Sequence, residues 1–166
     1  MENKKLLFNR EIAEKKLHRM ALEIAERLTG DQAPLIILGI EKNGVVIAQK
    51  VATFLQPYLG FTIQLATIVL NKQKPEDVKI NLERDFNGVN IIIADDVTNS
   101  GRTLLYACKP LLSFHPKSIR TLVLVERMHR LFSVKPDFVG LSVATTLQDH
   151  IQVEVDGMEV SGAYLV

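Results

Sequence analysis

The amino-acid sequence predicts an α/β fold with a mainly parallel central sheet flanked by helices. Short, almost wholly apolar runs such as residues 35–40 and 89–94 are typical of strands that are covered on both faces. Segments with apolar residues at helical spacing alternate with these runs, as in strand–helix–strand folds. The chain has 166 residues and contains no repeat and no linker. We therefore expect residues 1–166 to form a single domain.

The composition argues against several classes of function. The 20 basic and 19 acidic residues leave a net charge of +1, so no uniform field attracts nucleic acid or an anionic membrane, and RNA binding has no support from net charge. The single cysteine, Cys108, excludes an internal disulfide and a cysteine-based zinc site. No apolar stretch approaches the roughly 18 residues of a membrane span, and the charged first residues lack the apolar run of a signal peptide. We expect a cytoplasmic protein without membrane contact.

The first half of the chain supplies two helices and two strands. A helix is expected over residues 9–28, with Asn9 as its cap and Gly30 just beyond its end. The apolar run 35–40 follows as a strand. A second helix begins after Gly44 and ends before Pro57, because the residue before a proline disfavours helical geometry. Residues 61–70 alternate loosely and predict another strand.

The second half begins with a charged segment. Residues 71–87 contain eight charged side chains among seventeen positions and no helical stripe, which predicts a long exposed loop or a loose hairpin. Loops of that length inside a domain are often functional. The remaining elements are a strand, a helix that starts near Arg102 and is shortened by Pro110, and four further strands. These strands are expected at residues 120–125, 138–143, 151–155 and the C-terminus.

The most informative pattern lies in residues 89–103. An apolar strand ends in two adjacent carboxylates, Asp95 and Asp96, and the chain then turns through small hydroxyl and amide residues into a helix. The backbone N–H groups of the turn, its hydroxyls and the helix dipole suit a phosphate. The carboxylates suit sugar hydroxyls or a magnesium ion and would repel the phosphate. Together these features indicate a phosphorylated ribose, whereas the simpler alternative is a solvated turn with an ordinary helix cap.

This pattern resembles the ribose-phosphate motif of the type I phosphoribosyltransferases. Residues 38–44 look like the pyrophosphate loop of that family, and residues 122–130 with 135–140 look like its base-binding strand and hood. Within the family, the greatest similarity is to the bifunctional pyrimidine-operon attenuation regulators with uracil phosphoribosyltransferase activity. The resemblance covers nearly the whole chain. It implies a mainly parallel sheet with a small hood and a flexible loop.

The resemblance also implies roles for particular residues. Asp95 and Asp96 would hold the ribose hydroxyls and, through them or through water, a magnesium ion; with Lys42 they form the expected catalytic set. The 5′-phosphate would lie in a loop made of Thr98, Asn99, Ser100, Gly101, Arg102 and Thr103. The pyrophosphate would meet Glu41, Lys42, Asn43 and Gly44. The base would contact Val97, Arg127, Phe138 and Val139.

The reaction that the resemblance implies is the transfer of a phosphoribosyl group from phosphoribosyl pyrophosphate to a nucleobase, with uracil as the expected base. A ring nitrogen of the base would displace pyrophosphate from the anomeric carbon. The protein would position the reactants, compensate charge with Mg²⁺ and Lys42, and exclude water with the loop 71–87. By analogy with the family, a homodimer or a larger homo-oligomer is expected.

Departures from the family pattern favour uracil and leave alternatives open. Hypoxanthine enzymes carry an acidic residue where Asn99 stands, a lysine where Glu126 stands and a metal-binding acid near Thr145, so a 6-oxopurine enzyme is a further alternative only. The uracil relatives usually offer an arginine where Asn43 stands, and their loop is longer. A nucleotide-sensing regulator with little turnover, with RNA binding as its sharpest form, is therefore the main alternative. A phosphoryl-accepting receiver domain also ends a strand in acidic residues, but it would leave the phosphate loop unexplained.

Overall fold

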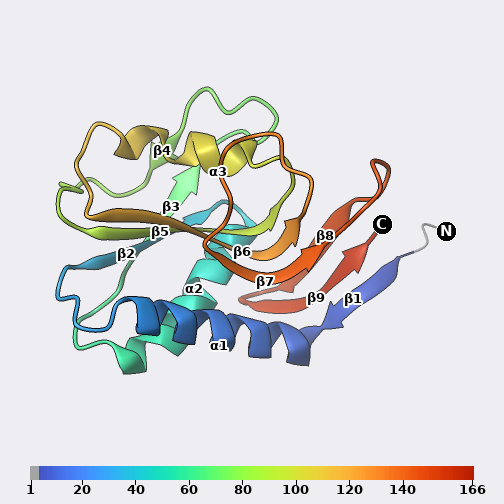
Figure 1. The fold of residues 1–166 in the computed structure, drawn as a ribbon, viewed down its shortest axis with the longest axis horizontal. Coiled ribbons are helices and arrows are strands. Elements are labelled where there is room, and N and C mark those ends of the chain that lie inside the picture. The colour runs from blue at the N-terminus through green and yellow to red at the C-terminus, as the bar shows by residue number, and fades with distance from the viewer. Residues whose placement is uncertain (1–3) are drawn as a thin grey trace.

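A six-stranded sheet forms the centre of the protein in the computed structural model, which describes residues 4–166 (Figure 1). The strand order is β4-β3-β2-β5-β6-β7, and only the pairing of β4 with β3 is antiparallel. The strands are β2 (Leu35–Ile40), β3 (Gln64–Val69), β4 (Lys79–Ile80), β5 (Asn90–Thr98), β6 (Ser118–Arg127) and β7 (Phe138–Val143). The predicted α/β class with a mainly parallel sheet is confirmed.

Helices cover both faces of this sheet. They are α1 (Arg10–Arg27), α2 (Asn43–Leu55) and α3 (Arg102–Ala107), with 3₁₀ turns η1 (Gln56–Tyr58) and η2 (Lys109–Leu111). Figure 1 shows α1 and α2 together on one side and α3 on the other. Successive strand residues point to opposite faces, so Ile37 and Ile92 join the core under α1 and α2, while Ile36 and Ile91 join the core under α3. Two cores explain why the strands are apolar throughout.

A second, antiparallel sheet forms a hood, but not from the residues expected: residues 122–127 and 138–140 lie in β6 and β7 of the central sheet. The second sheet consists of β1 (Lys5–Asn9), β9 (Glu159–Leu165) and β8 (Ile151–Asp156) in that order. The predicted last strand pair is confirmed, but β1 was not expected. Only Phe8 of β1 is fully buried, so this edge strand shows no alternating pattern, and its partner β9 lies at the other end of the chain. Asn9 caps α1 as predicted, because its side chain accepts a hydrogen bond of 3.0 Å from the backbone N–H of Ile12.

Strand β5 is longer than the sequence indicates. The prediction ended it at Ala94, but pairing with β6 continues to Thr98, opposite Glu126. Asp95 and Asp96 therefore lie inside the strand rather than in a turn after it. Pairing with β2 on the other side stops at Ala94, opposite Gly39. The acidic pair thus begins where β5 loses one neighbour, at the carboxyl end of the sheet, which is the usual place for ligands in such folds.

The segment between β3 and β5 is the predicted long loop with a short hairpin. Its strand β4 pairs with the end of β3, where Val69 lies opposite Lys79. The loop is also anchored, since Phe86 is buried and its ring packs edge-on against Phe114 with 5.3 Å between centroids. Pro110 lies in η2, which follows the end of α3 at Ala107, so the helix is short, as predicted.

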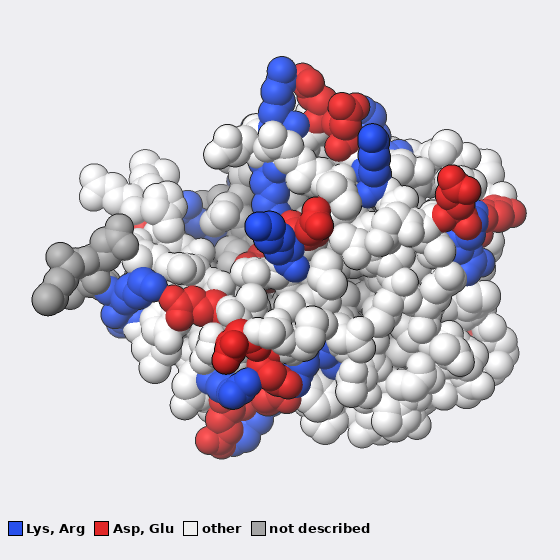
Figure 2. Space-filling model, turned by 180° about the vertical axis from the view of Figure 1, so that it is seen from behind, with Lys and Arg blue, Asp and Glu red and all other residues white. Residues whose placement is uncertain are grey.

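Charged side chains of opposite sign stand next to one another on the surface. On the face seen in Figure 2, basic and acidic side chains are interspersed rather than separated into single-sign patches. One such cluster joins three elements: Lys50 of α2 lies 2.6 Å from Glu14 of α1 and 2.8 Å from Glu159 of β9. Among residues 4–166, no helix is both long and apolar enough to cross a membrane.

The turn from β2 into α2 requires a close approach of backbone to backbone. A Cβ added at Gly39 would lie 2.7 Å from the carbonyl oxygen of Gly44 and 2.7 Å from the Cα of Val45. Both contacts are to backbone atoms, which cannot rotate away. Gly39 therefore allows α2 to begin directly over the end of β2.

We predict that Gly39→Ala lowers the free energy of unfolding by about 1–3 kcal/mol, the scale of overpacking a tightly packed site. Urea unfolding of the ligand-free protein measures this change. Gly60→Ala is the matched control, because a Cβ at Gly60 meets nothing within 4 Å; its effect should stay within about 0.5 kcal/mol. Equal stability of the two variants would contradict the tight turn.

Candidate active site

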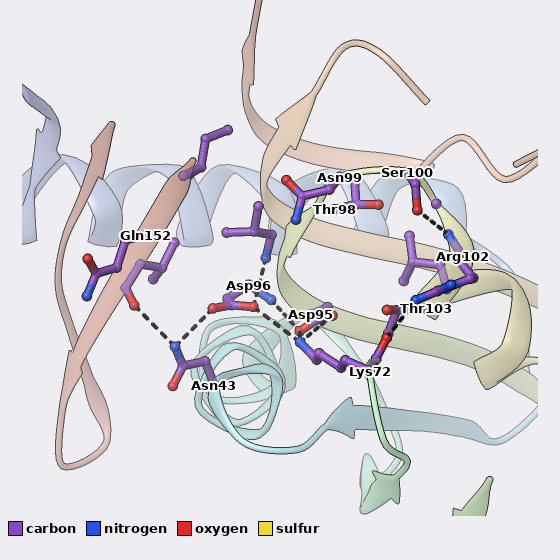
Figure 3. Close-up of a pocket in the computed structure, with 15 residues that line it drawn as sticks. Asn43, Lys72, Asp95, Asp96, Thr98, Asn99, Ser100, Arg102, Thr103 and Gln152 are labelled. Carbon is purple, nitrogen blue, oxygen red and sulfur yellow. Dashed lines mark hydrogen bonds and ion pairs between the residues drawn. The ribbon is translucent and has the colours of Figure 1, made fainter. Parts of the chain in front are cut away.

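A hollow of about 530 Å³ opens at the carboxyl end of β5 (Figure 3). The end of β5, the turn into α3, the loop after β3 and the hood strand β8 form its walls. The lining residues are Asn43, Lys72, Asp95, Asp96, Val97, Thr98, Asn99, Ser100, Gly101, Arg102, Thr103, Leu104, Ile151, Gln152 and Val153. The structure thus brings together the acidic pair and the whole loop 98–103 that the sequence indicated.

The two aspartates at the floor of this hollow are both buried. Asp95 is 1% exposed and Asp96 is 9% exposed. One oxygen of Asp95 accepts a hydrogen bond of 2.9 Å from the backbone N–H of Asp96, and one oxygen of Asp96 accepts one of 2.9 Å from Val97. Two neighbouring carboxylates in so little water require further donors or a counter-charge.

Lys72 supplies the counter-charge from the loop after β3. Its ammonium group lies 3.1 Å from each oxygen of Asp95 and 3.8 Å from Asp96. Burial nevertheless raises the pKa of Asp95, with Asp96 as the second cause, and the attraction of Lys72 offsets only part of this; the resulting pKa is about 8. The acidic pair therefore holds less than two full negative charges near neutral pH.

The loop 98–103 has the groups that bind an anion. The Ser100 hydroxyl accepts a hydrogen bond of 3.3 Å from the backbone N–H of Arg102, and Gly101 has a φ of 88°, a left-handed conformation that favours glycine. The Ser100 carbonyl accepts hydrogen bonds of 2.9 and 3.0 Å from the backbone N–H groups of Leu131 and Phe132. These bonds from the segment after β6 hold the loop in shape. Backbone N–H groups and hydroxyls in one loop suit a phosphate.

Arg102 joins this loop to the loop that carries Lys72. Its guanidinium donates hydrogen bonds of 3.2 Å to the carbonyl of Lys72 and 3.1 Å to that of Gln73. Although Arg102 was expected to wrap a phosphate, its side chain in this structure holds the neighbouring loop. The backbone N–H of Arg102 remains part of the turn.

The loop 41–44 forms a second, more open hollow of about 280 Å³ beside the first. Glu41, Lys42, Asn43, Lys72 and Asp96 line it, so the two hollows share three residues. The peptide bond between Glu41 and Lys42 is cis. A Cβ at Gly44 would lie 2.6 Å from the carbonyl oxygen of Ala94, so the start of α2 rests directly on β5. Lys42 is exposed and supplies the cation of this loop.

Three of the four expected base contacts lie elsewhere. Phe138 is the first residue of β7, is 2% exposed and has Arg27 of α1 5.4 Å from its ring; it does not line the hollow. The carbonyl of Val139 accepts a hydrogen bond of 2.9 Å from Arg19. Arg127 donates to Thr145 and to the carbonyl of Thr146. Only Val97 of the expected set lines the hollow.

Residues 151–153 of β8 line the wall of the hollow, whereas Phe138, Val139 and Arg127 do not. Sequence reasoning missed them because β8 belongs to the second sheet and carries no chemical pattern of its own. Lys72 lies in the predicted loop 71–87, and nothing in the local sequence shows that its ammonium group reaches Asp95. Phe138 was misleading because its motif begins a strand, whereas ligands bind where parallel strands end.

The residues present fit a magnesium ion only in part. Mg²⁺ prefers six oxygen ligands and usually takes one or two from protein carboxylates, with the rest from water and substrate phosphates. Asp95 and Asp96 offer carboxylate oxygens at one place, and within the described part of the chain no group of three His, Cys, Asp or Glu residues comes together for a metal. The site therefore suits an ion held largely by the substrate.

Comparison with known proteins places the chain in a family. It belongs to the phosphoribosyl transferase domain family, whose profile matches residues 5–159. The protein is therefore a phosphoribosyltransferase, which transfers a phosphoribosyl group from phosphoribosyl pyrophosphate to a nucleobase. This membership also excludes the receiver-domain alternative.

Individual proteins of known name resemble the chain over most of its length. The chain is 33% identical over 153 residues to the Bifunctional protein PyrR of Latilactobacillus sakei, covering 85% of each chain. It is 33% identical over 171 aligned positions to the Bifunctional protein PyrR of Leuconostoc mesenteroides, covering 96% of this chain and 97% of that one. Among solved structures, hypoxanthine phosphoribosyltransferase of Trypanosoma cruzi has a TM-score of 0.73 at 20% identity, covering 84% and 81%. At that identity the structural likeness concerns the fold alone.

The raised pKa of Asp95 predicts a pH dependence of stability. The folded protein keeps a proton on Asp95 between the ordinary pKa of 3.8 and about 8, whereas the unfolded chain has lost it. Stability of the empty protein should therefore be greatest below this window and fall as pH rises through it, by at most about 1.4 kcal/mol per pH unit. Asp95→Asn removes this contribution.

Urea unfolding at pH 5, 6.5 and 8 without magnesium measures the effect. We expect the stability of Asp95→Asn relative to wild type to increase steadily as the pH rises. A constant difference across the three pH values would show that Asp95 is fully ionised throughout, held in that state by Lys72.

Proposed function

We propose that the protein transfers a phosphoribosyl group from phosphoribosyl pyrophosphate to uracil. The observation that carries this proposal is the placement of a buried acidic pair and a hydroxyl- and amide-rich loop on one hollow. The choice of uracil rests on two residues. Asn99 lines the hollow but cannot act as a general base, and Glu126 accepts a hydrogen bond of 2.7 Å from Ser142 where a 6-oxopurine enzyme would present a cation.

Each part of the substrate has a counterpart in the site. The loop 98–103 would bind the 5′-phosphate, and Asp95 and Asp96 would accept hydrogen bonds from the ribose hydroxyls. The pyrophosphate would extend into the second hollow, where Lys42 faces it. The base would lie between Val97 and the wall formed by β8. This arrangement replaces the contacts expected from Phe138, Val139 and Arg127.

The reaction would proceed at the anomeric carbon between these subsites. The bond from this carbon to the pyrophosphate oxygen breaks, and the pyrophosphate leaves with the electron pair. A ring nitrogen of the base forms the new bond and gives up its proton to the departing pyrophosphate or to water. Positive charge develops on the sugar in between. The site contributes mainly by holding the two reactants in line and by placing carboxylates near the sugar. Mg²⁺, when bound, would supply charge compensation for the pyrophosphate.

A nucleotide-sensing regulator on the same fold is the second candidate. The observation in its favour concerns position 43, where the uracil relatives usually have an arginine. The Asn43 side chain is uncharged and bonds to Asp96, so Lys42 is the cation that loop 41–44 offers a pyrophosphate. RNA binding by such a regulator has no support from the interspersed charges of Figure 2. A homodimer or larger homo-oligomer and a cytoplasmic location stay predictions.

One assay separates these functions. Protein, Mg²⁺ and phosphoribosyl pyrophosphate are mixed with uracil, hypoxanthine, guanine or xanthine, and pyrophosphate release is followed. Turnover with uracil alone supports the proposal, and turnover with a purine identifies a 6-oxopurine enzyme. Binding of phosphoribosyl pyrophosphate without turnover favours the regulator.

Removing a charge from the acidic pair tests the ribose subsite. Asp96→Asn should weaken binding of phosphoribosyl pyrophosphate at least tenfold, because the amide offers one acceptor oxygen in place of two charged ones. Calorimetric titration measures the affinity, and the thermal melting curve checks that the fold is intact. Unchanged affinity in a folded variant would remove Asp96 from the site.

Removing one hydroxyl tests the phosphate loop. Ser100→Ala should weaken phosphate binding by about 1–2 kcal/mol, the scale of one hydrogen bond to a charged group. Ser113→Ala is the control, since the Ser113 hydroxyl bonds only to the carbonyl of Pro110. Titration with ribose 5-phosphate compares the two variants. A loss of the same size in both would show that the effect is not specific to the loop.

A further inference from the structure

We propose that Asn43 is a positioning residue that fixes Asp96 and joins it to the hood strand β8. The inference rests on the proposed function of the hollow, and it changes the role expected for Asn43 from the sequence, which was contact with pyrophosphate. The role is set by where the side-chain amide points. It turns toward Asp96 and β8, as Figure 3 shows.

The amide nitrogen of Asn43 makes two hydrogen bonds at once. It donates to a carboxylate oxygen of Asp96 at 2.9 Å and to the backbone carbonyl of Val153 at 3.1 Å. A side-chain amide has two N–H groups, so both are used. The donor that a pyrophosphate would need from this side chain is therefore already engaged.

These bonds complete the support of Asp96. Its other oxygen accepts the backbone N–H of Val97 at 2.9 Å, so each carboxylate oxygen has one fixed donor. Such bonds restrict the rotation of the carboxylate and set the direction of its remaining lone pairs. Those lone pairs are the ones available to a sugar hydroxyl in the hollow.

Asn43 is itself held in place. It is the first residue of α2, and the next residue, Gly44, lies so close to β5 that an added Cβ would meet the carbonyl of Ala94 at 2.6 Å. The amide therefore starts from a rigid point. Because Val153 belongs to β8, the second hydrogen bond fixes the distance between the ribose carboxylate and the wall of the hollow.

Two ligands distinguish this role from a pyrophosphate contact. The affinities of ribose 5-phosphate and of inorganic pyrophosphate are measured by calorimetry for wild type, Asn43→Ala and Asn43→Asp. We expect Asn43→Ala to weaken ribose 5-phosphate about tenfold, the effect of losing one hydrogen bond to a charged group, and to change pyrophosphate less than twofold. Asn43→Asp should weaken ribose 5-phosphate at least as much, because it places an acceptor against Asp96.

Gln49→Ala is the matched control on the same helix, since the Gln49 amide reaches only Thr53, at 3.5 Å. Hydrogen exchange gives a readout that does not depend on a ligand. The amides of residues 151–156 should exchange faster in Asn43→Ala and at the wild-type rate in Gln49→Ala.

In an Asp96→Asn background, Asn43→Ala should change ribose 5-phosphate affinity less than twofold, because the two residues act as one unit.

The outcomes separate the inference from the function on which it rests. A wild-type protein that does not bind ribose 5-phosphate overturns the proposed function. A wild-type protein that binds it while Asn43→Ala binds equally well overturns the positioning role. Weakened pyrophosphate affinity in Asn43→Ala, with ribose 5-phosphate unaffected, restores the role expected from the sequence.

Discussion

The burial of two adjacent aspartates at the end of β5 is the constraint on which the rest of the site depends. Asp95 and Asp96 lie in sequence and in space where β5 has passed the end of β2, so they are inside the protein yet face a hollow. Buried carboxylates are costly unless donors or cations surround them. Here the donors come from three different elements: Lys72 from the loop after β3, Asn43 from the start of α2, and the backbone of β5 itself.

That need for donors explains the arrangement of the surrounding elements. Gly39 and Gly44 allow α2 to approach β5 closely, which places Asn43 next to Asp96. The same amide reaches Val153, so the hood is attached to the central sheet at the site itself. Arg102 holds the carbonyls of Lys72 and Gln73, so the loop that supplies the cation is tied to the loop that would bind phosphate. The parts of the site are thus connected through the groups that donate to the two buried carboxyl groups.

Much of the fold and of the site could be predicted from short contiguous stretches of the sequence. The strands 35–40 and 89–94 could be recognised because a sheet covered on both faces needs continuous apolar runs, and the acidic pair with its loop is a short contiguous pattern. The features that could not be predicted depend on contacts between segments that are distant in the sequence. Strand β1 needs β9, the Lys72–Asp95 pair joins residues 23 positions apart, and β8 reaches the hollow only through the hood. Phe138 is an aromatic residue that could stack on a base, but it lies at the start of β7 rather than at the carboxyl end of the sheet.

The two side-chain partners of the acidic pair differ in exposure and in how firmly their backbones are held. Lys72 is 42% exposed at its side chain and is carried by a loop, whereas Asn43 is fixed at the start of a helix that rests on β5. A ligand with hydroxyl donors can therefore displace Lys72 at modest cost because the ammonium group regains water. Displacing Asn43 would also break its hydrogen bond to the carbonyl of Val153 in β8. Because buried carboxylates without donors are costly, a ligand that displaces Lys72 would have to bring donors of its own. A sugar with adjacent hydroxyls satisfies that requirement without adding charge, whereas a free phosphate would bring negative charge against the carboxylates.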